Sequence, residues 1–212
     1  MKTDVLTIYS DLKGKDAAME TAEKFASYHG LTGRNAMHLR LLTEETICML
    51  HGILSDFKGN FWIESEKTKK GLICRICVSA RKSVNEKQED DLLAVSTSGK
   101  NESAKGIAGK IREILRWSVQ QSDVDDITAN PWYYMGTGQT GMMTGVETYM
   151  NCWSLQQYRD AVSSSDTYSS EERDELERSI IAKIADEVKV WLKKDVTEIV
   201  IEKSFGSKPG EA

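Results

Sequence analysis

The sequence predicts an α/β (α+β) two-layer sandwich, in which helices cover one face of a mixed, mostly antiparallel sheet. Helical and alternating apolar patterns follow one another as strand, two helices, hairpin, helix, insertion, helix and hairpin. Strands that are neighbours in sequence are expected to pair as hairpins, and the strongest helical segment, residues 34–54, is apolar enough to lie against a sheet. A single layer of helices leaves the other sheet face open to solvent, to a protein partner or to a second copy of the chain.

Composition and charge describe an ordinary globular chain rather than a nucleic-acid or membrane protein. The 212 residues carry a net charge of −5, so no positive field would attract nucleic acid or an anionic membrane. No apolar run is long enough to cross a bilayer, and the first residues lack a signal peptide. Four scattered cysteines favour a cytoplasmic protein with reduced thiols. We expect one domain over residues 1–205, with an insertion at about 123–165 and a frayed tail at 206–212.

The first part of the chain predicts a strand followed by two helices. Residues 5–9 form a short apolar run typical of a strand. Asp16 is expected to cap a helix over residues 17–28, which Gly30 then ends in a left-handed conformation. The next helix, residues 34–54, carries two adjacent apolar lines that predict a wide buried face. The first line contains Met37, Leu41 and Cys48, and the second contains Leu39, Leu42, Met49 and Ile53.

Glu44 lies on the first of these lines, where an apolar residue would be expected. A carboxylate in such a position is costly to bury unless it is paired, hydrogen-bonded or directed into a cavity. Glu44 is therefore an acid that activates a water or substrate hydroxyl, or a structural carboxylate bonded to Arg40 or His51, or a solvated group on a helix turned away from this face. Its neighbour Glu45 is expected at the surface.

A hairpin follows the second helix, with strands at residues 60–66 and 72–80. The second strand alternates, and its face containing Cys74 is expected to cover the 34–54 helix. Cys74 and Cys77 have the spacing of a metal knuckle or a redox pair, but three residues along a strand place their side chains on opposite faces. Ordinary cysteines are therefore favoured, and no metal site is predicted.

The remainder of the chain alternates helical patterns with a segment of unusual composition. Residues 123–152 are rich in glycine, methionine and aromatic residues and poor in charge. The sequence shows no internal repeat. The expected elements are helices at residues 107–119, 155–162 and 171–187, and a closing hairpin with strands at residues 188–192 and 198–205.

The insertion has two interpretations that the residues leave open. Its methionine and aromatic side chains between Trp132 and Trp153 form either an adaptable binding patch or a small satellite core. Within it, residues 136–141 share the glycine pattern of phosphate-cradling loops but lack the Lys-Ser/Thr end of a P-loop. A lid or packing loop is the better interpretation of that segment.

Four segments of the chain carry the pattern of a known family. They are LRLLTEETICMLHGI at residues 39–53, FWIESEKTKKGLICRICVSA at 61–80, AKGIAGKIREIL at 104–115 and VKVWLKKDVTEIVIEKSF at 188–205. In this pattern the chain resembles the histidine-kinase-like ATPase superfamily (the GHKL or Bergerat fold), and within it the anti-sigma-factor serine kinases of bacteria. The resemblance implies ATP and Mg²⁺ as cofactors and Glu44 as the catalytic acid or base. It also implies nucleotide-binding positions at Cys48, Lys105, Gly106 and Gly109.

The chain departs from the family pattern at two motifs. The family places an Asn four residues beyond its Glu to hold Mg²⁺, where this chain has Cys48, or Met49 if counted from Glu45. The hairpin ends in Ser79-Ala80-Arg81-Lys82, without the Asp-x-Gly that binds adenine in the family. The resemblance therefore implies a degenerate fold, in a cytoplasmic bacterial regulatory protein that acts by protein–protein interaction or as a homodimer, with weak or no nucleotide binding.

Two alternatives to this function stay open. The first is an active anti-sigma-factor-type serine kinase or ATPase, with Glu44 as base. Its missing groups would come from residues elsewhere in the chain, such as Asn85, Asp90, Asp91 or Asn101. The second alternative is a small-ligand binding domain whose pocket wall is the insertion at residues 132–153.

Overall fold

The computed structural model describes residues 1–54, 56–82, 152–164, 174, 179–193 and 196–206, which contain six strands and four helices. In chain order these are β1 (Leu6–Tyr9), α1 (Lys15–Tyr28), α2 (Arg34–Ile53), β2 (Phe57–Thr68), β3 (Gly71–Lys82), β4 (Cys152–Ser154), α6 (Leu155–Ser164), α8 (Ile180–Ile184), β5 (Glu187–Lys193) and β6 (Val196–Gly206). None of the described helices combines the length and the apolar character that a membrane crossing requires.

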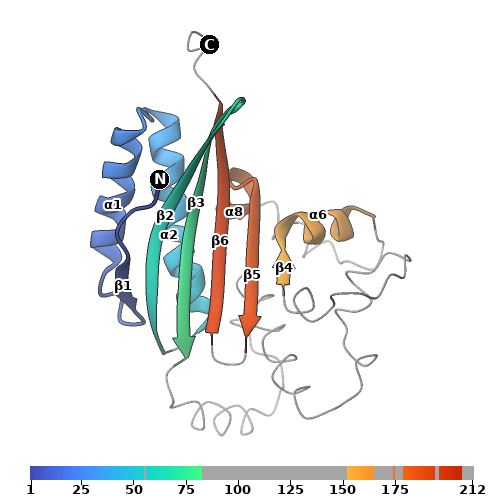
Figure 1. Ribbon diagram of the computed structural model, residues 1–212. Helices are drawn as coiled ribbons and strands as arrows, with labels where there is room; N and C mark the ends of the chain where they lie inside the picture. The colour runs from blue at the N-terminus through green and yellow to red at the C-terminus, as the bar shows by residue number, and fades with distance from the viewer. Residues whose placement is uncertain (55, 83–151, 165–173, 175–178, 194–195, 207–212) are drawn as a thin grey trace, which may run out of the picture.

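All six strands belong to one sheet, in the order β1-β2-β3-β6-β5-β4. Every neighbouring pair is antiparallel, so the expectation of a mixed sheet is wrong for the described residues. The reason is that the two hairpins meet through their second strands, β3 and β6, which run in opposite directions. Helices α1, α2 and α8 lie on one face of the sheet, as the prediction of a two-layer sandwich requires (Figure 1).

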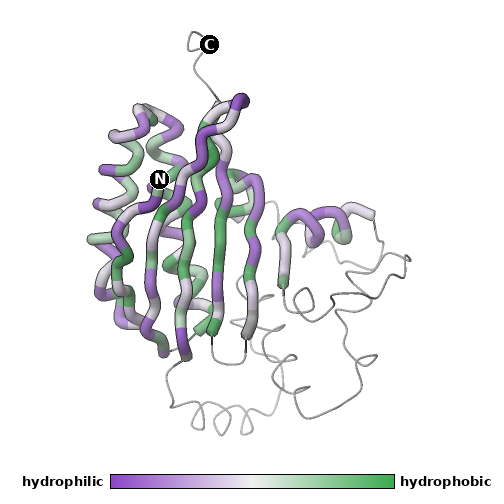
Figure 2. Tube along the Cα trace, viewed as in Figure 1, coloured by the Kyte–Doolittle hydropathy of each residue, from purple (hydrophilic) through white to green (hydrophobic). Residues whose placement is uncertain are grey.

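The core lies between the sheet and this helical layer, and every described helix and strand contributes a buried side chain to it. On β3, Cys74, Ile76 and Val78 are each 1% exposed, which confirms the inward face predicted for this strand. The intervening residues of β3 face away from the helices. Figure 2 shows the resulting changes of hydropathy along the central strands.

Helix α2 is turned relative to the orientation that its two apolar lines predicted. The line that begins at Leu39 is buried, but Met37 on the other line is 59% exposed and Cys48 also lies at the surface. Thr43 and Thr46 are fully buried instead. Their hydroxyls donate to backbone carbonyl oxygens one turn earlier in the helix, at 2.9 and 2.5 Å, so neither is left without a hydrogen bond.

Helix α1 begins after Gly14, and the predicted cap, Asp16, lies in its first turn instead. Gly14 has a φ of 89°, a left-handed conformation that glycine adopts without strain. A Cβ atom at this position would lie 2.4 Å from the carbonyl oxygen of Thr7 in β1. Tyr9 N also donates to Lys13 O at 3.1 Å, so the loop before α1 packs directly against the outer edge of the sheet.

The helix predicted over residues 171–187 is wrong at Ser179, which is extended and caps α8, and at its C-terminal end. Helix α8 ends at Ile184, and strand β5 begins at Glu187. Burial then alternates along β5, because this segment pairs as a strand with β6. Of residues 171–178, only residue 174 is described, and it is helical.

Among the described elements, each half of the sheet has an edge strand, two helices and a hairpin in chain order, although the sequence shows no repeat and residues 165–173 and 175–178, between α6 and α8, lie outside the described part. The N-terminal half contains β1, α1, α2, β2 and β3, and the C-terminal half contains β4, α6, α8, β5 and β6. In both hairpins two residues separate the last paired positions. Strands β3 and β6 join the halves, with Ile76 paired to Ile201 at the middle of their ladder. An approximate twofold axis through this pair therefore relates the two hairpins. It does not relate the edge strands, because β4 pairs with residues 189–191 of β5, which correspond to residues 64–66 of β2, whereas β1 pairs with residues 58–61.

Candidate functional site

Glu44, the predicted catalytic residue, lies at the boundary between α2 and α1. Its carboxylate accepts a hydrogen bond from Lys15 Nζ at 2.9 Å, and 40% of its side chain is exposed. The hydrogen bond to Glu44 is the main reason that the pKa of Lys15 is raised. Arg40 binds Glu23 on α1 instead. Glu44 is therefore a paired carboxylate near the surface, and Lys15 is its partner rather than Arg40 or His51.

Glu45 is half-buried, so it is less exposed than the surface position predicted for it. Burial raises the pKa of its carboxyl, the charge of Glu44 adds to this effect, and Lys15 opposes it. Cys48 lies at the surface one turn beyond Glu44, and partial desolvation raises the pKa of its thiol. Mg²⁺ prefers oxygen ligands, so a thiol is a poor replacement for an amide. Within the described residues, no three His, Cys, Asp or Glu side chains are placed to hold a metal ion.

The other predicted nucleotide-binding residues, Lys105, Gly106 and Gly109, lie outside the described residues, together with the helix predicted around them. Residues 123–151 of the predicted insertion also lie outside. Trp153, which ends the methionine- and aromatic-rich stretch that begins at Trp132, is 3% exposed, and its ring centroid lies 5.9 Å from that of Tyr158. Trp153 therefore packs as a side chain of the main core.

Cys74 and Cys77 point to opposite faces of β3, as their spacing predicted. Cys74 faces the helices, whereas Cys77 lies on the other face and is nevertheless only 4% exposed. Burial raises the pKa of each thiol to about 12. Both are therefore protonated at neutral pH, which makes them poor nucleophiles and poor metal ligands.

The sheet face opposite the helices is a second candidate site, which we call the open face. In the register of the strands, Trp62, Cys77 and Val200 are direct neighbours and form its middle row. Its side chains come from alternate residues of four strands, namely Lys58, Asn60, Trp62, Glu64 and Glu66 of β2, Ile73, Arg75, Cys77, Ser79 and Arg81 of β3, Glu187, Lys189 and Trp191 of β5, and Val196, Glu198, Val200, Glu202 and Ser204 of β6.

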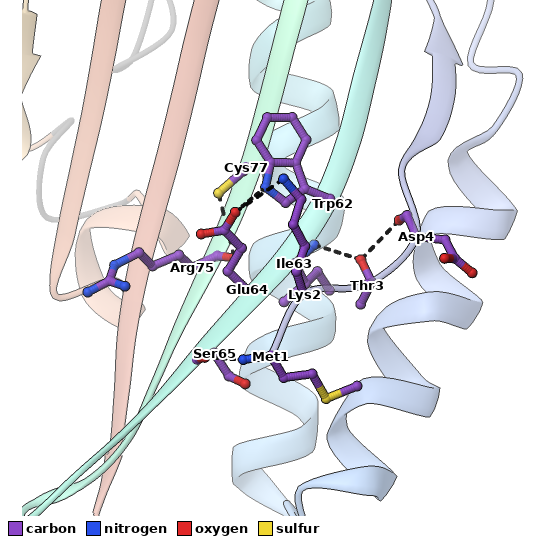
Figure 3. A network of polar contacts seen from close by, with 10 residues as sticks. All are labelled: Met1, Lys2, Thr3, Asp4, Trp62, Ile63, Glu64, Ser65, Arg75 and Cys77. Atoms are coloured by element: carbon purple, nitrogen blue, oxygen red, sulfur yellow. Dashed lines mark hydrogen bonds and ion pairs between the residues drawn. The ribbon is translucent and has the colours of Figure 1, made fainter.

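Polar side chains around Trp62 form a connected network on the open face (Figure 3). Trp62 Nε1 donates to Glu64 at 2.7 Å. Lys2 Nζ lies 4.4 Å from the ring centroid of Trp62 and 3.4 Å from Glu64 Oε1, so the indole ring and the carboxylate both attract the ammonium group. The chain before β1 also runs along β2, with Thr3 N donating to Ile63 O at 2.9 Å, and this holds Lys2 in place.

Arg75 links three strands of the open face. Its Nε donates to Glu202 on β6 at 2.8 Å, and its Nη2 donates to Glu66 on β2 at 3.0 Å. Hydrogen bonds to these two carboxylates, Glu202 first, raise the pKa of Arg75. All three side chains are partly exposed, so their pairing adds little stability and serves mainly to fix where the charges lie.

The open-face network could not be predicted from sequence spacing, because Trp62, Cys77 and Val200 come together only through the register of three strands. The alternation of β3 was the available signal, since it placed Arg75 and Cys77 on the outward face. Comparison of the chain with family models, with curated proteins and with solved structures gives no match.

Proposed function

We propose that this chain is a cytoplasmic bacterial regulatory protein that acts through protein–protein contact, on a histidine-kinase-like ATPase fold that has lost its nucleotide chemistry. The element order of the N-terminal half supports the fold part of this proposal. In the series of strand, helix, helix and hairpin, the second helix and the hairpin coincide with two of the segments that carry the resemblance. The closing hairpin of β5 and β6 coincides with a third such segment.

The observation that carries the proposal is the ion pair between Glu44 and Lys15. In the family that the chain resembles, this carboxylate would take a proton from a water or a hydroxyl group. In this chain a carboxylate oxygen already accepts a hydrogen bond from an ammonium group at 2.9 Å. A substrate would have to compete with Lys15 for that oxygen, so the pair serves the contact between α1 and α2 instead.

The residues beside Glu44 do not replace the missing chemistry. Cys48 offers a sulfur atom where Mg²⁺ prefers oxygen. Glu45 has the raised carboxyl pKa that a general base needs, but the residue four positions further on is Met49, which is buried and has no oxygen in its side chain. Neither acid is therefore accompanied by a ligand for a nucleotide-bound metal at the family's spacing.

The open face is the contact surface in this proposal. Trp62 and Trp191 are both partly exposed there and stand among charged residues. Tryptophan and arginine are enriched where proteins bind proteins, because each combines a large apolar area with a polar tip. Arg75 adds such a group close to the middle row.

Titration with ATP and ADP, with and without Mg²⁺, tests the loss of nucleotide chemistry. We expect no Mg²⁺-dependent rise in melting temperature at millimolar nucleotide, and no Mg²⁺-dependent heat of binding in calorimetry. A ligand present at a hundred times its Kd would add about 2.7 kcal/mol to the free energy of unfolding, so even modest affinity would be visible.

Two variants make this titration specific. Glu44→Gln removes the charge that pairs with Lys15, and Glu45→Gln is the matched change at the neighbouring position. Both should behave like the native protein towards nucleotide. A Mg²⁺-dependent stabilisation of the native protein that is lost in Glu44→Gln would contradict the proposal and favour an active serine kinase or ATPase.

A further inference from the structure

We propose that the open face binds a second copy of this chain, face to face, around a twofold axis that runs across the strands through the middle row. This inference rests on the proposed function as a protein-binding module and names its partner. Trp62, Cys77 and Val200 of one copy then lie against the same residues of the other. Lys189, which continues this row on β5, also faces Lys189 of the other copy at the end of the row.

The basic end of the open face is the first observation behind this inference. Lys58 and Arg81 are register neighbours on β2 and β3, and both are exposed. Neither has an ion-pair partner within the described part of the chain. Glu198 is a described carboxylate of the open face on this side of the middle row, so with Lys58 and Arg81 this end carries a net charge of about +1.

The opposite end of the open face, beyond the middle row, is acidic. Four carboxylates lie there with only two cations among them, which leaves a net charge of about −2, opposite in sign to the basic end. The carboxylates are Glu64, Glu66, Glu187 and Glu202, and the cations are Lys2 and Arg75.

This charge distribution selects one twofold arrangement of two copies. An axis that runs across the strands reverses the strand direction between copies, so the basic end of each copy faces the acidic end of the other. An axis along the strands would place like charges opposite each other, which is unfavourable. In the selected arrangement Lys58 faces Glu66 of the second copy, because the two residues lie on β2 at equal distances in sequence on either side of Trp62.

The apolar side chains of the open face lie where the centre of such an interface would form. Trp62 and Val200 are partly exposed, and they flank Cys77 in the middle row. Two sheets that pack face to face lie about 10 Å apart, a gap that side chains of this size fill. An apolar centre with charged residues towards the ends is also the usual layout of a protein interface.

Charge reversal at Lys58 tests the arrangement by sedimentation velocity over a range of protein and salt concentrations. The native chain should form a dimer whose Kd rises with salt. Lys58→Glu should raise this Kd by at least about tenfold, because it sets a carboxylate against Glu66 of the second copy. The double variant Lys58→Glu, Glu66→Lys restores opposite charges and should return the Kd to within about threefold of the native value.

The control variant is Lys183→Glu, which makes the same change of net charge at an exposed position of α8, on the helical side. It should leave the Kd unchanged. A chain that is monomeric at every concentration overturns the inference, and so does a Kd that Lys58→Glu leaves unchanged or that Lys183→Glu raises equally. A double variant that stays as weak as Lys58→Glu overturns the proposed axis.

These outcomes are distinct from a failure of the proposed function, which would appear as Mg²⁺-dependent nucleotide binding. If the chain is monomeric and binds no nucleotide, only the proposal of a dimer is contradicted. If the chain is dimeric and binds ATP with Mg²⁺, only the proposed loss of nucleotide chemistry is contradicted. Far-UV circular dichroism and the melting temperature show whether each variant is folded. Lys58 is exposed, so we expect its substitution to leave the fold intact.

Discussion

The described parts of the two halves place their three strands in corresponding order from the edge to the centre of the sheet, but they differ in size. Strands β2 and β3 have 12 residues each and α2 has 20, whereas β5 has 7 and α8 has 5. Among the described residues, most of the large side chains that are fully buried belong to the N-terminal half, and Leu155, Ile199 and Ile201 come from the other half. Buried apolar area is the main source of folding free energy, so within the described residues the N-terminal half contributes the larger share of it.

This comparison teaches that the arrangement of the strands can repeat while the side chains at related positions of the two halves differ. The approximate twofold axis relates Arg75 to Val200 and Cys77 to Glu202, so a charged residue in one half corresponds to an uncharged one in the other. At the centre, where the halves meet, both carry isoleucine, Ile76 and Ile201. The divergence on the open face is what gives it a basic end and an acidic end.

Substitution at the central pair should have the largest effect of the changes considered. Ile76→Ala and Ile201→Ala each remove a side chain that is at most 1% exposed, and each should lower the free energy of unfolding by about 2–5 kcal/mol. The double variant should lose less than the sum, because both changes enlarge one cavity. Urea unfolding measures these losses, with Met37→Ala at a 59% exposed position as the control.

A clear difference between the losses of unfolding free energy in Ile76→Ala and Ile201→Ala would contradict the correspondence of the two halves. If Ile201→Ala lowered the free energy of unfolding much less than Ile76→Ala, β6 would be loosely packed against β3. The C-terminal half would then contribute little to the common core. Strict additivity of the two losses would show that the side chains do not share a cavity.

A smaller effect is expected at the edge of the N-terminal half. Gly14→Ala places a Cβ atom 2.4 Å from Thr7 O at a φ of 89°, which should cost about 1–3 kcal/mol. Gly30→Ala is the matched control, since Gly30 also has a positive φ, 66°, but a Cβ there meets nothing within 4 Å. Thermal melts of both variants measure the difference. An equal loss in the two would show that contact with β1 adds nothing to the backbone strain.

The smallest expected effect is a pH dependence that belongs to the N-terminal half, which contains all three histidines of the chain. Burial lowers the pKa of His29, helped by Lys67 and the terminal ammonium group. Burial also lowers the pKa of His38, helped by Lys203 and Arg34. The unfolded chain therefore binds more protons than the folded chain below the ordinary pKa of 6.5. These residues contribute their full stability above pH 6.5, and the contribution is lost as the pH falls through the lowered pKa values.

Urea unfolding between about pH 7.5 and 5.5 measures this slope. His29→Gln should flatten it, because Gln does not titrate and can still reach Ser65 Oγ, which lies 3.0 Å from His29 Nε2. A slope that persists unchanged in His29→Gln would contradict the assignment to this residue.

Local pattern predicted most of the described elements, and interactions between distant residues account for the failures. Helices α1 and α2 begin and end within two residues of their predicted bounds, and the inward face of β3 was predicted correctly. The orientation of α2 was wrong because Thr43 and Thr46 look polar in the sequence but satisfy their own hydroxyls inside the helix. The partner of Glu44 was missed because Lys15 lies 29 residues earlier, on another helix.

The pairing of β3 with β6 has a consequence for synthesis on the ribosome. Ile76 meets Ile201, a residue made 125 positions later. At about 5–20 residues per second, about 6–25 s separate the emergence of the two strands. During that interval the nascent N-terminal half displays β3 as an unpaired strand edge, which is a template for aggregation. The N-terminal half is thus made first, and until β6 emerges its exposed edge is β3, the strand that later lies at the centre of the sheet.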